Sequence, residues 1–295
     1  MVTCVGGWGH PRYAGNTVHI FLRVMVMYSR YNNMRRLLDV KGAALMRVDQ
    51  IALQMYTVRD RTATDFAGTL RQVAEMGYRA IELAGYGGLS AAELKTALDD
   101  CGLRAMAAHV GYAQFEERAE EVIAELKGLG CDFAVVPALP QEYRTDEALL
   151  RQAAANFNRW GAVARDAGLR FAYHNHAFEF ATLGFGTAYD IIVGETDPSL
   201  VALELDLFWA QYGGVDAVAL TRKLGSRAPL LHVKDMAPGE KRADTPVGTG
   251  ILPWPEIMAA GKEIGAEWYI VEQDNPNDSI EDVRTSLRNL ERMAE

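Results

Sequence analysis

From residue 50 onward, short apolar runs alternate with longer stretches in which apolar residues recur every three or four positions. The first pattern is typical of buried strands and the second of amphipathic helices. We expect strands at residues 51–56, 79–83, 103–109, 133–137, 169–175, 201–207, 229–233 and 268–271. We expect helices at residues 64–76, 90–101, 116–129, 145–167, 187–195, 215–224, 253–264 and 280–294.

Local signals support the ends of these helices. Ser90 precedes Glu93 by three residues, which is the spacing of a capping box at a helix N-terminus. Glycine, the residue favoured just past a helix end, follows expected helices at Gly77, Gly102, Gly130, Gly168 and Gly265. The alternation of strand and helix is therefore supported at the boundaries as well as by the periodicity.

Eight strand-helix units over about 250 residues predict an α/β fold of the (β/α)₈ TIM barrel type. A doubly wound open sheet is the alternative, but no G-x-G-x-x-G motif follows the first expected strand. Gly85-Tyr86-Gly87-Gly88 comes after the second strand and has a different spacing. The barrel is the better interpretation.

Composition narrows the class of protein. The chain has 295 residues, of which 49% are hydrophobic and 23% charged, and its net charge of -9 disfavours nucleic acid as a partner. Its three cysteines, Cys4, Cys101 and Cys131, form no C-x-x-C motif, so a reducing, cytoplasmic setting is expected. The apolar run at 18–28 contains Arg23 and is about half the roughly 20 residues of a membrane span, so no membrane partner is expected.

Residues 1–45 differ from the rest of the chain. They contain six Lys or Arg and one acidic residue, whereas the remainder holds 24 basic and 38 acidic residues, a net charge of -14. We expect a basic N-terminal extension at 1–45 that is disordered or lies ahead of the native start at Met46, followed by a TIM barrel catalytic domain at 46–295. A basic targeting arm is the alternative, but no cleavage site of small residues is evident.

Charged and imidazole side chains close most of the expected strands. In a TIM barrel the C-terminal ends of the strands carry the active site, so position alone selects them as candidates. They are Glu82, His109, His174, His176, Glu204, Asp206, His232, Lys234 and Glu272. Buried carboxylates and imidazoles must be paired or bind a metal, and a mixed set suits Mn²⁺, Co²⁺, Zn²⁺ or Fe²⁺ better than Ca²⁺. The alternative is an ion-pair network, for example of Lys234 with Glu204 or Glu272.

These strand ends resemble those of the xylose isomerase-like TIM barrels, the sugar phosphate isomerases and epimerases. The resemblance runs from about residue 47 to the C-terminus and rests on segments 81–83, 108–110, 173–180, 204–209, 232–236 and 271–272. It implies one divalent metal ion, with Mg²⁺ also allowed, held by Asp206, His232 and Glu272. Related branches place a Glu where this chain has His174, so the fourth ligand is His174, His176 or Glu204.

The resemblance implies an isomerase, epimerase or lyase acting on a sugar, keto-sugar or polyol by proton abstraction beside a chelated carbonyl. Glu272 and Glu204 are the expected bases, and His109 is a further catalytic candidate that places hydroxyls or stabilises developing charge. Glu82, His176, Lys234 and Trp209 are the expected substrate-binding residues.

Two alternatives remain open. One is a DNA-repair phosphodiesterase similar to endonuclease IV, which the acidic barrel and its four histidines disfavour. The other is a catalytically idle binding barrel. The expected partner is a small carbohydrate, and a homo-oligomer stays open.

Overall fold

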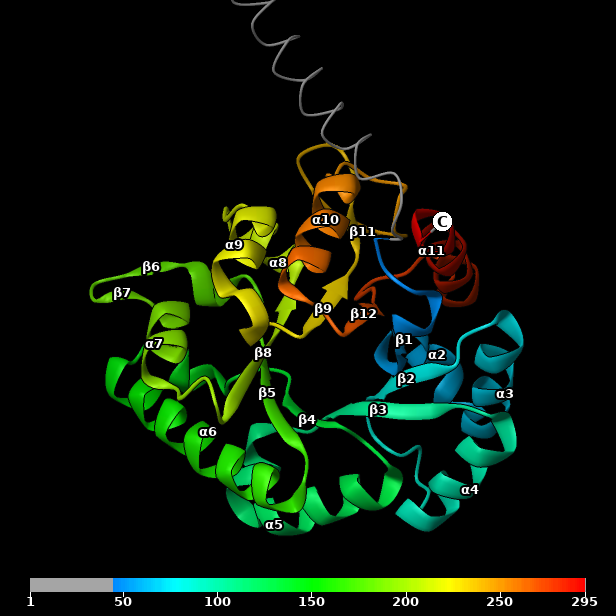
Figure 1. Cartoon of the computed structure of the whole chain (residues 1–295), viewed down its shortest axis with the longest axis horizontal. Coiled ribbons are helices and arrows are strands. Elements are labelled where there is room, and N and C mark those ends of the chain that lie inside the picture. Colours follow the sequence, from blue (N-terminus) through cyan, green and yellow to red (C-terminus); the bar gives the residue numbers. More distant parts are fainter. Residues whose placement is uncertain (1–44, 295) are drawn as a thin grey trace, which may run out of the picture. The chain divides into compact units, whose positions relative to one another are not determined.

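A computed structural model describes residues 45–294 of the chain. Eight parallel strands close into a barrel in the order β1-β12-β9-β8-β5-β4-β3-β2, with the helices around them (Figure 1). The barrel strands are β1 Ile51–Gln54, β2 Ala80–Leu83, β3 Arg104–His109, β4 Phe133–Val136, β5 Arg170–His174, β8 Val201–Asp206, β9 Leu230–Val233 and β12 Trp268–Val271. The predicted (β/α)₈ fold is confirmed.

Helices connect successive strands of the barrel. The α-helices are α2 Arg59–Thr62, α3 Phe66–Met76, α4 Ala91–Cys101, α5 Tyr112–Leu129, α6 Glu147–Ala167, α7 Ala188–Glu195, α8 Leu207–Tyr212, α9 Ala217–Leu224, α10 Trp254–Ile264 and α11 Ser279–Ala294. Short 3₁₀ segments lie at Val48–Gln50, Met55–Val58, Gln141–Tyr143, Phe178–Phe180 and Gly225–Arg227. Two small antiparallel pairs complete the described chain: β6 Thr182–Leu183 with β7 Gly186–Thr187, and β10 Asp235–Met236 with β11 Asp244–Thr245.

Most predicted helix boundaries agree with the structure to within two residues. The Ser90 side chain accepts from Glu93 N while Glu93 caps Ser90 in return, which forms the predicted capping box of α4. Three places differ. The expected strand at 51–56 ends at Gln54, and the 3₁₀ segment Met55–Val58 and helix α2, which were not predicted, follow it. Helix α5 begins at Tyr112 rather than at residue 116, because Gly111 already takes the extended N-cap conformation. The expected strand at 201–207 ends at Asp206, whose carboxylate caps the unpredicted helix α8 by accepting from Trp209 N.

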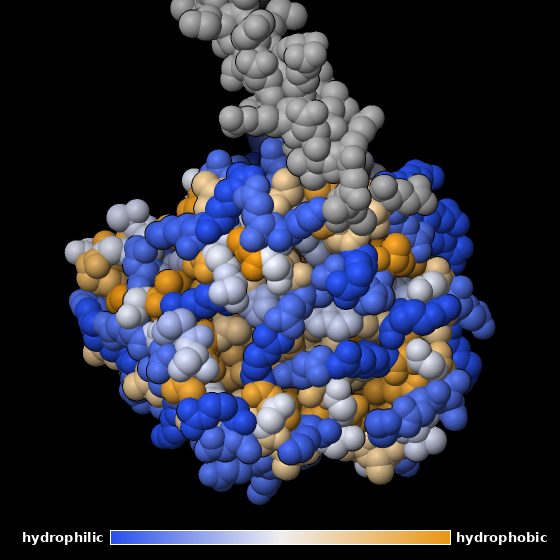
Figure 2. All heavy atoms as spheres, viewed as in Figure 1, coloured by the Kyte–Doolittle hydropathy of each residue, from blue (hydrophilic) through white to orange (hydrophobic). Residues whose placement is uncertain are grey.

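The core has two apolar layers separated by the strands. Inside the barrel, small side chains such as Ala52, Ala107 and Ala172 pack with the larger Phe133 and Ile270. Larger side chains fill the space between strands and helices, and on one side Phe157, Trp160 and Phe171 form an aromatic cluster with Phe115. On the face shown in Figure 2, hydrophilic residues cover much of the surface, with apolar residues scattered between them. The apolar filling of the barrel leaves its polar side chains at the C-terminal mouth.

A buried aspartate organises the segment after β9. The Asp235 carboxylate accepts hydrogen bonds from the backbone N–H of Gly248, Gly250 and Leu252 and from the indole N–H of Trp254, at 2.6 to 3.0 Å. Three residues between these donors, Thr249, Ile251 and Pro253, are exposed. This one side chain therefore binds every second residue of the segment 248–254, which we call the rim segment.

The predicted N-terminal extension lies outside the described residues, except for Leu45. Met46, the expected first residue of the barrel domain, is 3% exposed and belongs to the core. Across residues 45–294, no helix has the length and apolarity needed to cross a bilayer.

Candidate active site and metal centre

The candidate site lies at the C-terminal ends of six barrel strands, β2, β3, β5, β8, β9 and β12. Strand alternation turns Tyr173 outward to the aromatic cluster, where its ring lies 5.0 Å from Phe157, and turns His174 inward. Strand β5 ends at His174, so His176 belongs to the following loop. The ring of His176 still lies 5.0 Å from that of His174 because the loop folds back over the mouth.

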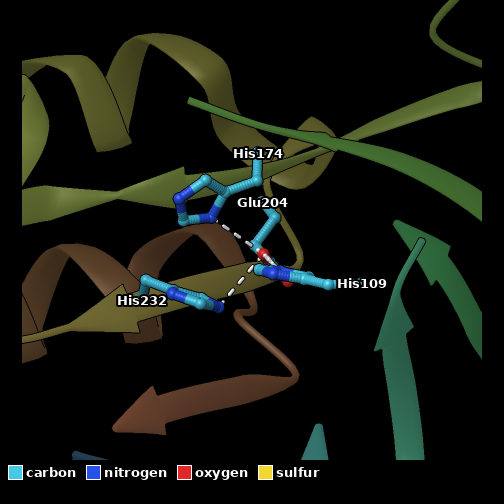
Figure 3. A group of neighbouring side chains, drawn as sticks. All are labelled: His109, His174, Glu204 and His232. Atoms are coloured by element: carbon cyan, nitrogen blue, oxygen red, sulfur yellow. Dashed lines mark hydrogen bonds and ion pairs between the residues drawn. The ribbon is translucent and has the colours of Figure 1, made fainter. Parts of the chain in front are cut away.

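Glu204 is the centre of a histidine cluster drawn in Figure 3. Its Oε1 lies 2.7 Å from His109 Nε2, 2.9 Å from His174 Nδ1 and 3.0 Å from His232 Nε2. The carboxylate itself is fully buried. Glu82 approaches the same histidines: its Oε2 lies 2.8 Å from His232 Nε2 and accepts a hydrogen bond from the Gln54 amide. The structure therefore brings the predicted Glu82, His109, His174, Glu204 and His232 together.

Lys234 forms a second cluster beside the first. Its ammonium lies 2.9 Å from Asp206 and 2.7 Å from both Glu272 and Asp274, and the lysine is fully buried. His232 connects the two clusters, since its Nδ1 lies 3.0 Å from Glu272 Oε2. This is the ion-pair network that the sequence left open for Lys234, with Glu272 rather than Glu204 as its partner.

Burial and neighbouring charges set the ionisation of these groups. Burial and the nearby Glu204 raise the pKa of Glu82 to about 7, and burial raises the pKa of Asp206 to about 6 against the pull of Lys234. Burial would raise the pKa of Glu272 too, but Lys234 and His232 hold it well below the usual value. Burial would lower the pKa of His109, yet Glu82 and Glu204 raise it. The mouth thus combines an ionised carboxylate with an imidazole that favours its protonated form.

Two groups of side chains have the donor atoms for a metal ion. Within each group the donor atoms all lie within 4.8 Å of one another. One group is His174, Asp206, His232 and Glu272, and the other is His109, His174, Glu204 and His232.

The donor chemistry fits a divalent cation in either group. Glu204 Oε2 in one group is buried without a hydrogen-bond partner in the described chain. In the other group Asp206 Oδ2 pairs closely only with Lys234, and the carboxylates there outnumber that single lysine. A cation would satisfy such groups, and mixed imidazole and carboxylate donors suit Zn²⁺, Mn²⁺, Co²⁺ or Fe²⁺.

A cavity of about 360 Å³ opens beside these clusters. The predicted residues on its wall are His109, His174, His176 and Glu272, and the wall also includes Tyr56 and Asp274. Six predicted residues are not among its lining residues, and all of them except Trp209 are fully buried: Glu82, Glu204, Asp206, His232, Lys234 and Trp209. Trp209 lies on α8 with its ring 5.7 Å from that of His176, so it supports this wall from behind.

Sequence reasoning missed three residues of the site. Asp274 follows Glu272 by two positions in the same charged cluster, and that spacing was the available signal. Glu179 is buried, accepts from the Tyr173 hydroxyl at 2.6 Å and from His176 N at 2.9 Å, and so fixes the loop that carries His176. Tyr56 is 43% exposed in the 3₁₀ segment after β1. It closed the expected strand at 51–56, but only charged and imidazole side chains were selected at the strand ends.

The fold and this site define a class: a (β/α)₈ barrel with imidazoles and carboxylates gathered at the C-terminal ends of its strands. More narrowly, the chain belongs to the xylose isomerase-like TIM barrel family, whose model matches residues 70–293.

Three known proteins illustrate the family. A sugar phosphate isomerase/epimerase from Parabacteroides distasonis is 26% identical, with a TM-score of 0.73 over 83% of this chain and 95% of that one. Inosose dehydratase from Geobacillus kaustophilus is 25% identical over 190 residues, which are 57% of this chain and 61% of the relative, so the match spans about three fifths of that enzyme. The IolI protein with a bound zinc atom, 15% identical with a TM-score of 0.65 over 83% of this chain and 98% of that one, shares the fold. Sugar isomerases, epimerases and dehydratases are thus the relatives of this chain.

Proposed function

We propose that this protein is a divalent-metal-dependent enzyme that removes a proton from the carbon next to a carbonyl of a sugar, keto-sugar or related polyol. The observation that carries the proposal is that Glu272 and His109 line one cavity beside the donor groups. An ionised carboxylate is a suitable base, and an imidazole with a raised pKa is a suitable proton donor. The outcome is isomerisation, epimerisation or elimination of water.

The proposed metal ligands are His174, Asp206, His232 and Glu272. When bound there, a divalent ion would polarise the substrate carbonyl and so acidify the neighbouring C–H group. The donor set is already oriented in this chain: the Asp206 Oδ1 is fixed by Trp209 N, and His232 is held between Glu82 and Glu272. Such second partners keep ligands in place and tune their basicity.

Glu272 is the proposed base. Lys234 and His232 keep it ionised, since burial alone would raise its pKa. His109, at the end of β3, lines the same cavity, and we propose it as the donor to the oxygen on which charge develops. Glu204 holds the imidazoles of His109, His174 and His232 at 2.7 to 3.0 Å, and this supports a positioning role or a place in the second donor group.

The names of the relatives favour carbohydrate chemistry. Inosose dehydratase, by its name, removes water from a cyclic polyol ketone, and the Parabacteroides protein is named an isomerase/epimerase. Both kinds of reaction can begin with loss of a proton next to a carbonyl. The acidic mouth disfavours a nucleic acid backbone, so the phosphodiesterase alternative has no support from this site.

The test is deuterium exchange in D₂O with inososes and keto-hexoses, followed by NMR at the carbon beside the carbonyl, together with metal analysis. Glu272→Gln should slow exchange by about 10²- to 10⁴-fold, the usual loss on removing a general base. The exposed carboxylate variant Glu120→Gln on α5 is the control and should exchange normally. Exchange at the normal rate in Glu272→Gln, or no metal in the native protein, would overturn the proposal in favour of a binding barrel.

Metal content distinguishes the two donor groups. Asp206→Asn should lose the metal if the proposed group is correct, whereas Glu204→Gln should retain it. The reverse result would assign the ion to His109, His174, Glu204 and His232. The zinc in the IolI structure makes zinc the first metal to test.

A further inference from the structure

A second cavity of about 320 Å³ adjoins the first one. His109 lines both cavities, and the consecutive residues Ala84 and Gly85 line one each. The second cavity lies between the loop after β2 and helix α5. Each cavity alone is at the lower end of the roughly 300–1,000 Å³ typical of small-molecule sites, and joined they reach the middle of that range.

The backbone around the second cavity is shaped to leave it open. Gly85, Gly87 and Gly88 have φ angles of 89°, 63° and 80°, the left-handed region that glycine favours. A Cβ at Gly85 or Gly88 would meet nothing within 4 Å, so at these two positions the loop turns without adding a side chain to the space that Tyr86 and Leu89 line. On the other wall, α5 leaves the helical conformation at Arg118, with φ -149° and ψ 48°.

Polar side chains with balanced charges share the lining of this cavity with the apolar Leu89, Val110 and Val122. The Arg118 guanidinium donates to Glu125 Oε1 at 2.8 Å, although a partner seven residues away in a straight helix lies about 10 Å along the axis. The Tyr86 hydroxyl also faces Glu125, at 3.4 Å, and Gln114 adds an amide. A phosphate would have to separate Arg118 from Glu125, whereas hydroxyl groups can bond to both without a net charge.

We propose that the substrate has two units: the reacting ring in the cavity of Glu272 and a second, uncharged hydroxylated ring in the cavity of Arg118 and Glu125. The substrate class is thus a glycoside rather than a phosphorylated monosaccharide. This inference rests on the proposed function for the reacting ring. His109, on the wall common to both cavities, marks where the linkage between the rings passes.

Binding measured by calorimetry tests the inference without requiring any reaction. The ligands are a hexose, its 6-phosphate and a panel of disaccharides that contain that hexose. At least one disaccharide should bind about tenfold more tightly than both the hexose and the phosphate, because it also uses the hydrogen-bonding groups of the second cavity. Tighter binding of the phosphate, or no disaccharide binding better than the hexose, would overturn the inference.

Two tryptophan variants on α5 locate the effect. Gln114 is exposed and lines the second cavity, so Gln114→Trp should fill the space without disturbing the core. It should remove the preference for the disaccharide and leave hexose binding within about twofold, since the hexose depends on the first cavity alone. The neighbouring Ala113→Trp, also exposed but not on the cavity wall, is the matched control.

Equal loss of both ligands in Gln114→Trp would refute the two-unit substrate. Deuterium exchange with a keto-hexose tests the proposed function separately. Failure of the two-unit substrate can therefore be distinguished from failure of the proposed function.

Discussion

Replacing Lys234 with methionine removes the one ammonium that three carboxylates share. Methionine keeps a similar length and an apolar stem, and it can pack against Trp209, whose ring lies 5.5 Å from the lysine nitrogen. The change therefore isolates the loss of charge. It leaves Asp206, Glu272 and Asp274 without their partner at 2.7 to 2.9 Å.

The expected destabilisation follows from the burial of the network. Lys234, Asp206 and Glu272 are 0%, 0% and 5% exposed, so water solvates these three groups poorly; only Asp274, with 21% of its side chain exposed, is partly solvated. Breaking a buried ion pair by removing one partner costs about 3–5 kcal/mol. For a barrel of this size each kcal/mol lowers the melting temperature by about 2–4 °C, so Lys234→Met should melt about 6–20 °C below the native protein.

Thermal unfolding followed by circular dichroism measures the effect, with a chelator in every sample so that no cation takes the place of the lysine. Lys95→Met is the matched control, because Lys95 pairs with Asp99 on the surface of α4 and both side chains are well exposed. An exposed i,i+4 pair contributes about 0.3–0.5 kcal/mol, so this control should shift by less than about 2 °C. If the melting temperature of Lys234→Met also fell by less than about 2 °C, the reasoning that the ionised carboxylates depend on this lysine would be refuted.

Three further predictions concern the rest of the barrel. Gly161→Ala in α6 should destabilise the protein, because the new Cβ would lie 2.4 Å from the Leu200 carbonyl oxygen. Gly128→Ala in α5 should instead stabilise the protein by up to about 1 kcal/mol, because a Cβ there meets nothing within 4 Å. Urea unfolding of the two variants measures both changes in the free energy of unfolding. Burial raises the pKa of Glu179 to about 8, so the folded protein retains a proton that the unfolded chain releases above about pH 4.5. Stability should therefore fall as pH rises toward 8, and Glu179→Gln should reduce this decline in urea midpoints at pH 5 and 8. A protein beginning at Met46 should melt and react like the full chain, since every strand and site residue described here lies after it; a lower melting temperature would contradict this.

The sequence predicted the barrel because its signals are local. The ends of all eight strands, and the capping box at Ser90, depend on residues that are neighbours in the chain. Helix α8 was missed for the same reason. The apolar residues Leu207, Phe208 and Trp209 continue the strand pattern, and only the Asp206 side chain, folded onto Trp209 N, ends the strand.

The site was less accessible to sequence reasoning because its contacts are not local. Their position at strand ends identified Glu204 and Lys234 as candidates, but it did not identify the side chains that surround them. Three histidines from three different strands surround Glu204, and three carboxylates from β8 and the segment after β12 surround Lys234. The depth at which a side chain lies in the barrel depends on the packing of all eight strands, so burial beneath the cavity could not be inferred from spacing.

The hydrogen bonds of Asp235 have a consequence for protein engineering. Three of the four donors from the rim segment are backbone N–H groups, so the outward side chains of Ile251 and Pro253 take no part in these hydrogen bonds. Thr249 differs, because its hydroxyl donates to the Pro246 carbonyl oxygen at 2.6 Å. Ile251 and Pro253 can therefore be randomised together in a library that leaves the rim backbone intact, while Thr249 is kept. Gly250 must stay glycine, because a Cβ there would lie 2.3 Å from the Met236 carbonyl oxygen. Asp235 thus separates the positions that maintain the fold from those at which new surface chemistry can be selected.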